Sequence, residues 1–209
     1  MSKTKEKILS ISRMLFNTHG YSNVTIRMIA IEAKMSSGNL NYHFKKRDDI
    51  LEALYFEMVA VFDRRIKQLN TTEITLETVK EQIVSGLQRM IDYRFFWTDL
   101  YNLLKLNTKI KSHFLNAHKE RTKGYHYLFE ILIGKKILND FAFDRESSFL
   151  IERMINYSNT WLYNSFVYEI EINDDDIIQY AQNLMGILYP YFTDLGKKQY
   201  KELFPKLFV

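Results

Sequence analysis

The sequence predicts an all-α protein: an N-terminal three-helix unit with a helix-turn-helix, followed by an antiparallel helical bundle. Three observations predict it. Apolar residues recur with the period of an α-helix in nearly every segment. The 209 residues include only 7 glycines and 2 prolines, so few positions interrupt long helices. Basic residues are concentrated in residues 1–47, which sets that segment apart from residues 48–209 and predicts two domains.

The first domain carries the signals of three short helices. One apolar stripe defines the first helix: Ile8, Ile11 and Leu15. Gly20 stands at its C-cap, where glycine is favoured. Thr25 is a suitable N-cap for a second helix, and Ser36 for a third helix that runs to Phe44. Two short helices joined by a tight turn have the spacing of a helix-turn-helix.

Longer helices follow. The helix expected at 47–69 has an apolar side made of Leu51, Leu54, Tyr55, Met58, Phe62, Ile66 and Leu69. Further helices are expected at about 75–93, 95–108, 110–133, 145–171 and 174–192, with a shorter one in the tail. Breaks are expected at residues 70–72 and 139–140, and Asn173 is a strong cap for the helix that starts at 174.

The charge is uneven along the chain. Residues 1–47 hold nine Lys or Arg and two Glu, a net of +7, whereas the remainder holds 20 basic and 23 acidic residues, a net of −3. A basic head suits a polyanion, and a solvated lysine-rich terminus is the alternative. Lys45, Lys46 and Arg47 crowd the start of a helix, where cations are unfavourable unless an external anion binds there. This placement favours nucleic acid.

Several classes of site are not expected. The chain has no cysteine, which excludes disulfides and thiolate chemistry. His113 and His118 are five residues apart, on different faces of a helix, so a metal pair is not expected. The sequence has no phosphate loop and no other catalytic motif, which argues against an enzyme or a bound cofactor. Without a signal peptide or membrane span, a cytoplasmic protein with no membrane partner is expected.

A more specific pattern covers the first 51 residues. It consists of Ile8-Leu-Ser-Ile-Ser-Arg-Met-Leu-Phe16, Gly20-Tyr21, Thr25-Ile-Arg-Met-Ile-Ala30, Ala33, Ser36, Gly38-Asn-Leu-Asn-Tyr-His-Phe44 and Ile50-Leu51. At these positions the chain resembles the TetR family of DNA-binding transcriptional regulators. The resemblance implies that a short recognition helix, with small polar residues at its start, enters the major groove of an operator.

The resemblance also implies which residues meet DNA. Those expected at backbone phosphates are Thr25, Arg27, Tyr42, His43 and Lys46. Those expected at base edges are Ser37, Asn39 and Asn41, next to the small residues Ser36 and Gly38. The alternatives are packing against the first helix for Tyr42 and His43, capping alone for Thr25 and Ser36, and a solvated charge for Arg27.

Two departures from the family pattern affect this interpretation. Lys34 stands where the family has a glycine in the turn, so a positive φ there would strain it, unless the turn differs. Asn41 replaces a tyrosine. Because asparagine pairs bidentately with adenine, an A·T pair in the half-site is a hypothesis.

The last two long helices are apolar over more than one face, which suggests a second surface to cover. A four-helix interface between two copies matches how the family dimerises. The residues predicted for it are Ser158, Trp161, Leu162, Ser165, Ala181, Leu184 and Leu188. The alternative is that these helices are central within one chain.

The middle helices are rich in aromatic residues. The resemblance implies a small-molecule pocket there, and the residues predicted to line it are Tyr93, Phe96, Trp97, Tyr101, Tyr125, His126 and Phe129. An ordinary aromatic core is the alternative. We therefore expect a homodimeric regulator, a repressor released from a near-palindromic operator by a small, mostly apolar ligand. A helical lipid or small-molecule carrier, or a ligand-independent partner-binding protein, is the rival reading, but it leaves the basic head unexplained.

Overall fold

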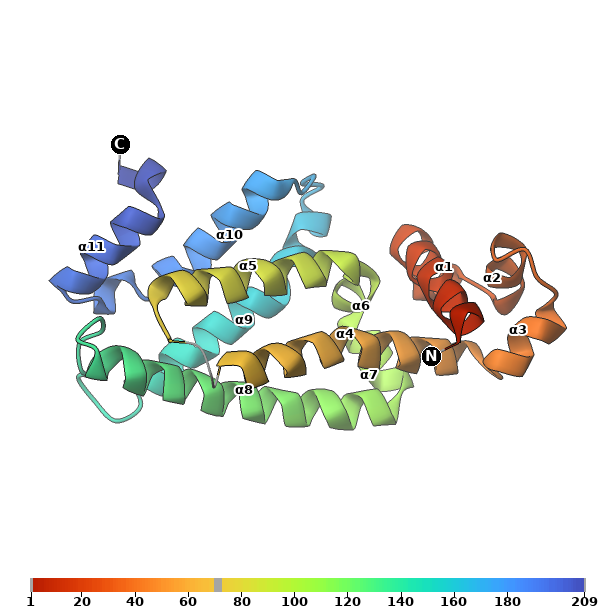
Figure 1. Cartoon of the computed structure of the whole chain (residues 1–209), viewed down its shortest axis with the longest axis horizontal. Coiled ribbons are helices and arrows are strands. Elements are labelled where there is room, and N and C mark those ends of the chain that lie inside the picture. Colours follow the sequence, from red (N-terminus) through yellow and green to blue (C-terminus); the bar gives the residue numbers. More distant parts are fainter. Residues whose placement is uncertain (1, 70–72, 209) are drawn as a thin grey trace. The chain divides into compact units, whose positions relative to one another are not determined.

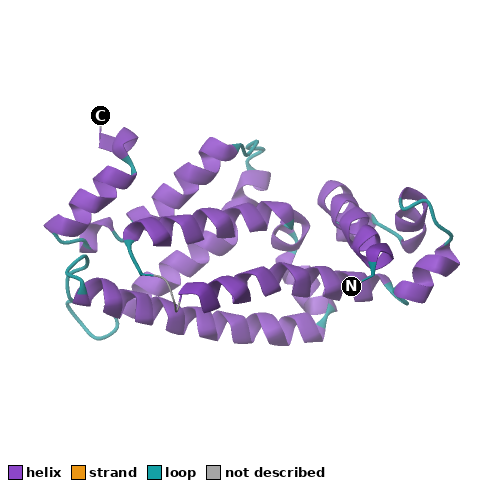
Figure 2. Cartoon of the chain, in the orientation of Figure 1, coloured by secondary structure: helices purple, strands orange, loops and turns teal. Residues whose placement is uncertain are grey.

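The computed structural model describes the backbone of residues 2–69 and 73–208, and the side chains of residues 2–60 and 73–208. All regular structure in these ranges is helical, which confirms the predicted fold class (Figure 2). By packing, the chain forms two compact units, residues 1–64 with 91–113 and residues 65–90 with 114–209. The functional boundary predicted at residue 47 is a different division and stays a prediction.

The first unit contains the helix-turn-helix (Figure 1). Its elements are α1 (Lys3–His19), η1 (Tyr21–Asn23), α2 (Ile26–Glu32), α3 (Ser37–His43), most of α4 (Arg47–Leu69), α6 (Arg94–Thr98), α7 (Leu100–Leu106) and the start of α8 (Thr108–Gly134). The predicted caps are confirmed. Gly20 ends α1 with φ 76°, and the hydroxyls of Thr25 and Ser36 accept hydrogen bonds at the starts of α2 and α3.

Asn17 of α1 holds the start of α6. Its Nδ2 donates to the carbonyl of Asp92 over 2.9 Å, and its Oδ1 accepts from the main-chain N–H of Phe95 over 3.1 Å. Nearby, the rings of Phe16 and Phe95 pack with their centroids 5.3 Å apart. No side chain of α6 or its preceding residue caps this short helix, so α1 supplies the cap from a distant part of the sequence.

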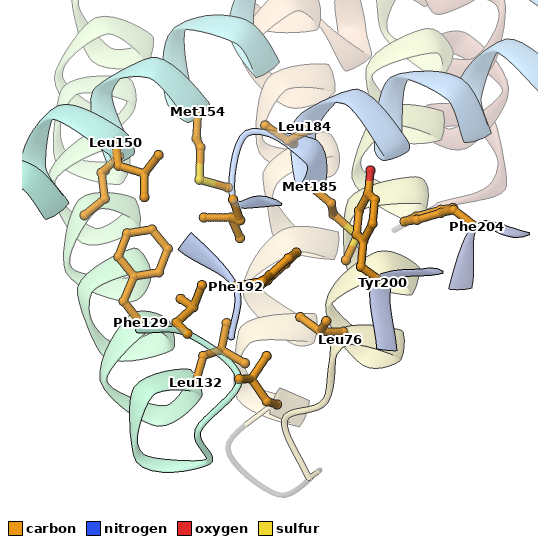
Figure 3. Packing of buried hydrophobic residues seen from close by; sticks show 14 of the residues in the cluster. Leu76, Phe129, Leu132, Leu150, Met154, Leu184, Met185, Phe192, Tyr200 and Phe204 are labelled. Atoms are coloured by element: carbon orange, nitrogen blue, oxygen red, sulfur yellow. The ribbon is translucent and has the colours of Figure 1, made fainter. Parts of the chain in front are cut away.

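The second unit is a bundle around one apolar core. Its elements are α5 (Leu76–Asp92), the rest of α8, α9 (Glu146–Val167), α10 (Asp174–Gly186), η2 (Tyr189–Tyr191), α11 (Asp194–Leu203) and η3 (Pro205–Phe208). Figure 3 shows side chains from α5, α8, α9, α10 and α11 meeting in this core. Asn173 and Asp176 form a capping box at the start of α10, which confirms the predicted cap.

Three predicted helices end differently in the structure. The one expected at 95–108 is broken at Asp99 into α6 and α7. The one expected at 145–171 ends at Val167, because Glu169 turns to φ 54° and the Ile170 N–H bonds back to the carbonyl of Ser165. The one expected at 174–192 ends at Gly186, because Pro190 has no N–H to bond to the Gly186 carbonyl.

The helix predicted at 47–69 has the expected bounds as α4. On its predicted apolar side, Leu51, Leu54, Tyr55 and Met58 are buried, whereas the side chains of Phe62, Ile66 and Leu69 lie outside the described residues. Of the two predicted breaks, residues 139–140 lie between α8 and α9, and residues 70–72 lie outside the described residues.

Gly196 allows a close approach of α11 to the rest of its unit. A Cβ at this position would lie 2.2 Å from the carbonyl oxygen of Ile137 and 3.0 Å from the Phe192 side chain. We expect Gly196→Ala to lower the free energy of unfolding by about 3 kcal/mol, because main chain must move to admit the methyl group. Urea denaturation measures this. Gly134→Ala is the matched control, because a Cβ there meets nothing within 4 Å. Equal stability of the two variants would contradict the close approach.

Candidate nucleic-acid interface

The turn between α2 and α3 is tight and contains a strained lysine. Lys34 has φ 54°, in the left-handed region that favours glycine. The turn therefore keeps the conformation expected where the family has a glycine, and the alternative of a different turn does not hold. The turn is closed by hydrogen bonds from Lys34 N–H to the Ile31 carbonyl and from Met35 N–H to the Ala30 carbonyl, each 3.0 Å long. The strain costs about 1 kcal/mol. The Lys7 ammonium of α1 also donates to the Ala33 carbonyl over 2.7 Å, which ties α1 to this turn.

The hydroxyls that start α2 and α3 are used for capping. Thr25 Oγ1 accepts from the Met28 N–H over 3.2 Å, and Ser36 Oγ accepts from the Asn39 N–H over 3.1 Å. These bonds set the direction in which each helix begins. Both residues remain exposed, so their capping role does not close them off from an external partner.

α3 presents a polar face and buries an apolar one. Leu40 and the following Phe44 are buried in the unit. The exposed residues of α3 are Ser37, Gly38, Asn39, Asn41 and Tyr42. Tyr42 is 84% exposed, so packing against the first helix does not explain it. His43 is half-buried, with its ring centroid 5.2 Å from that of Tyr42, and its packing alternative stays open.

Gly38 has open space around it. A Cβ there would have only the Ser36 hydroxyl within 4 Å, at 3.9 Å, and its φ is not positive. Neither packing inside the unit nor backbone conformation therefore requires a glycine at this position of α3. A side chain at this position would therefore be limited by a molecule that approaches the helix from outside.

Arg47 corrects one part of the charge argument. The sequence places it among three cations predicted to face an external anion, but its Nη1 donates to the carbonyls of Val24, Tyr21 and Ser22 over 2.8, 3.1 and 3.3 Å. Its guanidinium also lies over the Tyr21 ring, 4.1 Å from the centroid. Arg47 is therefore a structural clamp. The sequence cannot show this, because the carbonyls it binds lie more than 20 residues earlier.

The acidic residues at the start of α4 are also engaged within the unit. Asp48 accepts a short hydrogen bond from the Tyr21 hydroxyl. Burial and this bond raise the pKa of Tyr21 to about 12. Asp49 accepts from the main-chain N–H of Lys46 over 2.9 Å. The side chains of Lys45 and Lys46 stay exposed, as do those of Arg27 and Lys34. Exposed cations therefore precede and follow α3 in the sequence, and another lies on α2.

The residues predicted for a ligand pocket fall in both units. In the first unit, Tyr93 donates to Glu57 over 2.5 Å, and Phe96 packs against Tyr55 with ring centroids 5.2 Å apart. Trp97 is buried beside Phe96, whereas Tyr101 is 77% exposed. In the second unit Phe129 is buried in the core, and Tyr125 and His126 are half-buried. Tyr93, Phe96 and Phe129 are packed in the cores of their units, which is the alternative to lining a ligand pocket.

The residues predicted for the dimer interface are all buried within one chain: Ser158, Trp161, Leu162, Ser165, Ala181, Leu184 and Leu188. They do not form a surface that a second copy could contact, so this residue assignment is corrected. An apolar sequence pattern cannot distinguish a helix central in its own unit from one at an interface. The exposed apolar residues at the end of α9 are different ones: Tyr163, Phe166, Val167, Tyr168 and Ile170.

Known families match this architecture over most of the chain. A family of bacterial regulatory proteins, the tetR family, matches residues 8–54, and a TetR family described as bacterial transcriptional repressor matches residues 57–200. The chain belongs to the TetR family. Its relatives are likewise transcriptional regulators, which confirms the prediction of a regulator and not an enzyme.

Individual relatives of this TetR-family chain are distant. The regulator QacR of Staphylococcus aureus is 26% identical over 65% of this chain and 75% of its own length. YerO of Bacillus subtilis is 25% identical over 85% of this chain but 61% of its own length, and YttP from the same species is matched over 63% of its length. A TetR-family regulator from Marinobacter aquaeolei has the same fold, with a TM-score of 0.88, 24% identity and 98% of each chain covered.

Within residues 2–60 and 73–208, no group of three or more His, Asp or Glu side chains is placed to hold a metal ion. No helix in the described part is both long and apolar enough to cross a bilayer.

The open surroundings of Gly38 give a prediction in two parts. Gly38→Ala should leave the protein as stable as before or raise its stability by about 0.5–1 kcal/mol, because alanine is the better helix former. The same change should weaken DNA binding, because the methyl group occupies space between α3 and the DNA. Thermal unfolding and DNA titration measure the two effects. A variant that binds DNA normally would contradict a close approach at Gly38.

Proposed function

We propose that this TetR-family regulator is a repressor that binds a near-palindromic operator as a homodimer and is released by a small, mostly apolar ligand. The exposed polar face of α3 is the observation that carries the DNA part of the proposal. It begins at a capped N-terminus, is backed by buried Leu40, and has exposed cations on both sides in sequence. A carrier or partner-binding protein would leave this face without a purpose.

In this proposal the exposed residues divide into two roles. Thr25, Arg27, Tyr42, His43 and Lys46 contact phosphates and fix the position of the head. Ser37, Asn39 and Asn41 contact base edges in the major groove, and Asn41 selects adenine. The exposure of Tyr42 supports its role, because its hydroxyl is free to reach beyond the protein surface.

The dimer in this proposal uses the exposed apolar end of α9, which we call the α9 patch: Tyr163, Phe166, Val167, Tyr168 and Ile170. Apolar side chains grouped on one helix end are typical of a contact surface. A second copy covering the α9 patch would give a two-fold protein. Its two heads would then read half-sites separated by one turn of DNA or a multiple of it.

The ligand acts through a population shift. It releases the DNA only if it binds the DNA-incompetent state more tightly than the competent one. Repression would result from blocking polymerase at the operator, in the cytoplasm where the DNA is accessible.

A fluorescence-anisotropy titration against DNA flanking the gene tests the DNA part, with a scrambled duplex as control. We expect tight binding to the flanking DNA that weakens steeply with salt, because lysine and arginine displace counterions from phosphates. Lys46→Gln should reduce the slope of log affinity against log salt by about one. Lys119→Gln, an exposed lysine on α8, is the matched control and should leave it unchanged.

Two results would contradict this part of the proposal. Failure to bind either duplex at low salt would show that the protein does not bind DNA. An unchanged salt slope in Lys46→Gln would show that Lys46 does not contact a phosphate, and would move the phosphate contacts to the other exposed cations.

The α9 patch gives a separate prediction. Phe166→Glu should turn the dimer into a monomer, because a carboxylate cannot be buried against an apolar surface without a partner. Light scattering coupled to size-exclusion chromatography measures the mass. Leu195→Glu, a similarly exposed apolar residue on α11, is the control and should stay dimeric. A dimeric Phe166→Glu would place the interface elsewhere.

A further inference from the structure

The partners that the described residues give Arg121 on α8 are uncharged. In the second unit its Nη2 donates to Ser158 Oγ over 2.5 Å and its Nη1 to Asn159 Oδ1 over 3.0 Å, both on α9. Its guanidinium also lies 5.8 Å from the centroid of the Tyr125 ring. Among the described residues no carboxylate pairs with it. The side chain is half-buried, so its charge is partly removed from water.

The nearby groups do not neutralise this charge. Glu120, its neighbour in the sequence, is paired with Lys123 over 2.8 Å. Ser158 directs its own hydroxyl proton to the carbonyls of Met154 and Ile155, so toward Arg121 it is only an acceptor. A partly desolvated cation without a counter-charge is unfavourable, and it becomes favourable when an anion binds. Since two N–H groups hold α9, the remaining donors of the guanidinium are available to such an anion.

The stretch of α8 before Arg121 is open. Every residue from Leu115 to Glu120 is exposed, and this stretch is longer than one helical turn, so no face of the helix is covered there. Elsewhere on α8, Phe129 and Leu132 are buried in the core. An exposed stretch of helix therefore leads up to Arg121.

On its other side, Arg121 stands at the end of a row of aromatic rings. Tyr125 lies one turn further along α8 and Phe129 one turn beyond that. The row continues through Phe141 to Tyr191, with successive ring centroids 6.3, 5.6 and 5.9 Å apart. Figure 3 shows Phe129 extending from α8 toward Leu150 of α9 in the core. Tyr125, half-buried, is the ring of this row next to the cation.

We propose that Arg121 binds the anionic group of the effector, and that the effector is an amphipathic anion: a carboxylate joined to an apolar body that lies against Tyr125. Guanidinium and carboxylate match in a planar, bidentate geometry, which makes arginine the favoured partner for this group. This inference rests on the proposed function, in which a small molecule releases the repressor from its operator. It narrows the class of that molecule from mostly apolar to apolar with one negative charge.

Isothermal titration calorimetry of the full chain tests the proposal with two probes of equal chain length and opposite charge, dodecanoate and dodecyltrimethylammonium, both below micelle-forming concentrations. We expect saturable binding of dodecanoate and much weaker binding of the cation. In Arg121→Gln the dissociation constant for dodecanoate should rise about tenfold or more, because a charge-assisted contact is lost. Arg121→Lys keeps the charge but not the planar, bidentate guanidinium. Its dissociation constant should therefore lie between those of the unaltered chain and Arg121→Gln.

Arg153→Gln is the matched control, because it removes an exposed arginine from α9, the helix whose Ser158 and Asn159 bind Arg121. It should bind dodecanoate as the unaltered chain does. Absence of dodecanoate binding, equal binding of both probes, or equal affinity of the unaltered chain and Arg121→Gln would each overturn the proposal. The comparison of two probes on the unaltered chain does not depend on whether the variants fold.

The DNA titration separates this inference from the proposed function. Arg121-dependent binding of dodecanoate that leaves DNA affinity unchanged would support the anion site and remove ligand-driven release from the proposed function. Release of DNA by dodecanoate from Arg121→Gln at the same concentration as from the unaltered chain would keep ligand-driven release and overturn the role of Arg121. Binding of dodecanoate by a chain that does not bind DNA would support the anion site alone.

Discussion

Three main-chain carbonyls after the end of α1, those of Tyr21, Ser22 and Val24, are bonded to the single guanidinium of Arg47 at the start of α4. The segment between these two points contains α2, the turn and α3, so the clamp fixes both ends of the helix-turn-helix. The Tyr21 ring beneath the guanidinium and its bond to Asp48 add to the same junction. Within α3 itself, Leu40 is the buried residue.

The clamp also decides which charges face outward. Arg47 and Asp48 are used internally, and Asp49 caps the start of α4. Lys34, Lys45, Lys46 and Arg27 remain exposed around α3, whereas Asp48 and Asp49, although also exposed, accept hydrogen bonds from the unit itself. A charge count over residues 1–47 gives the right sign for the surface but assigns one cation to the wrong role. The sequence gives the charged residues of a segment, whereas hydrogen bonding within the fold determines which of those residues can contact an external molecule.

Local signals were enough to predict the helix-turn-helix. Gly20, Thr25 and Ser36 act within one or two turns of their own positions, and all three do what local chemistry indicates. Pro190 is equally local, and the predicted helix should have ended before it. The clamp by Arg47, the cap by Asn17 and the burial of Trp161 depend on residues far away in the sequence. Apolar periodicity shows that a helix face is covered, but not whether its own chain or a second copy covers it.

The cap that Asn17 provides ties the folding of two elements together. α6 is too short to form a stable helix alone, and its first turn is held by a side chain from α1. Whenever the last turn of α1 unravels, α6 loses its cap, so this turn and α6 should open as one cooperative unit. In native-state amide exchange, the N–H groups of α6 would then share the protection of α1, although α6 itself is only five residues long.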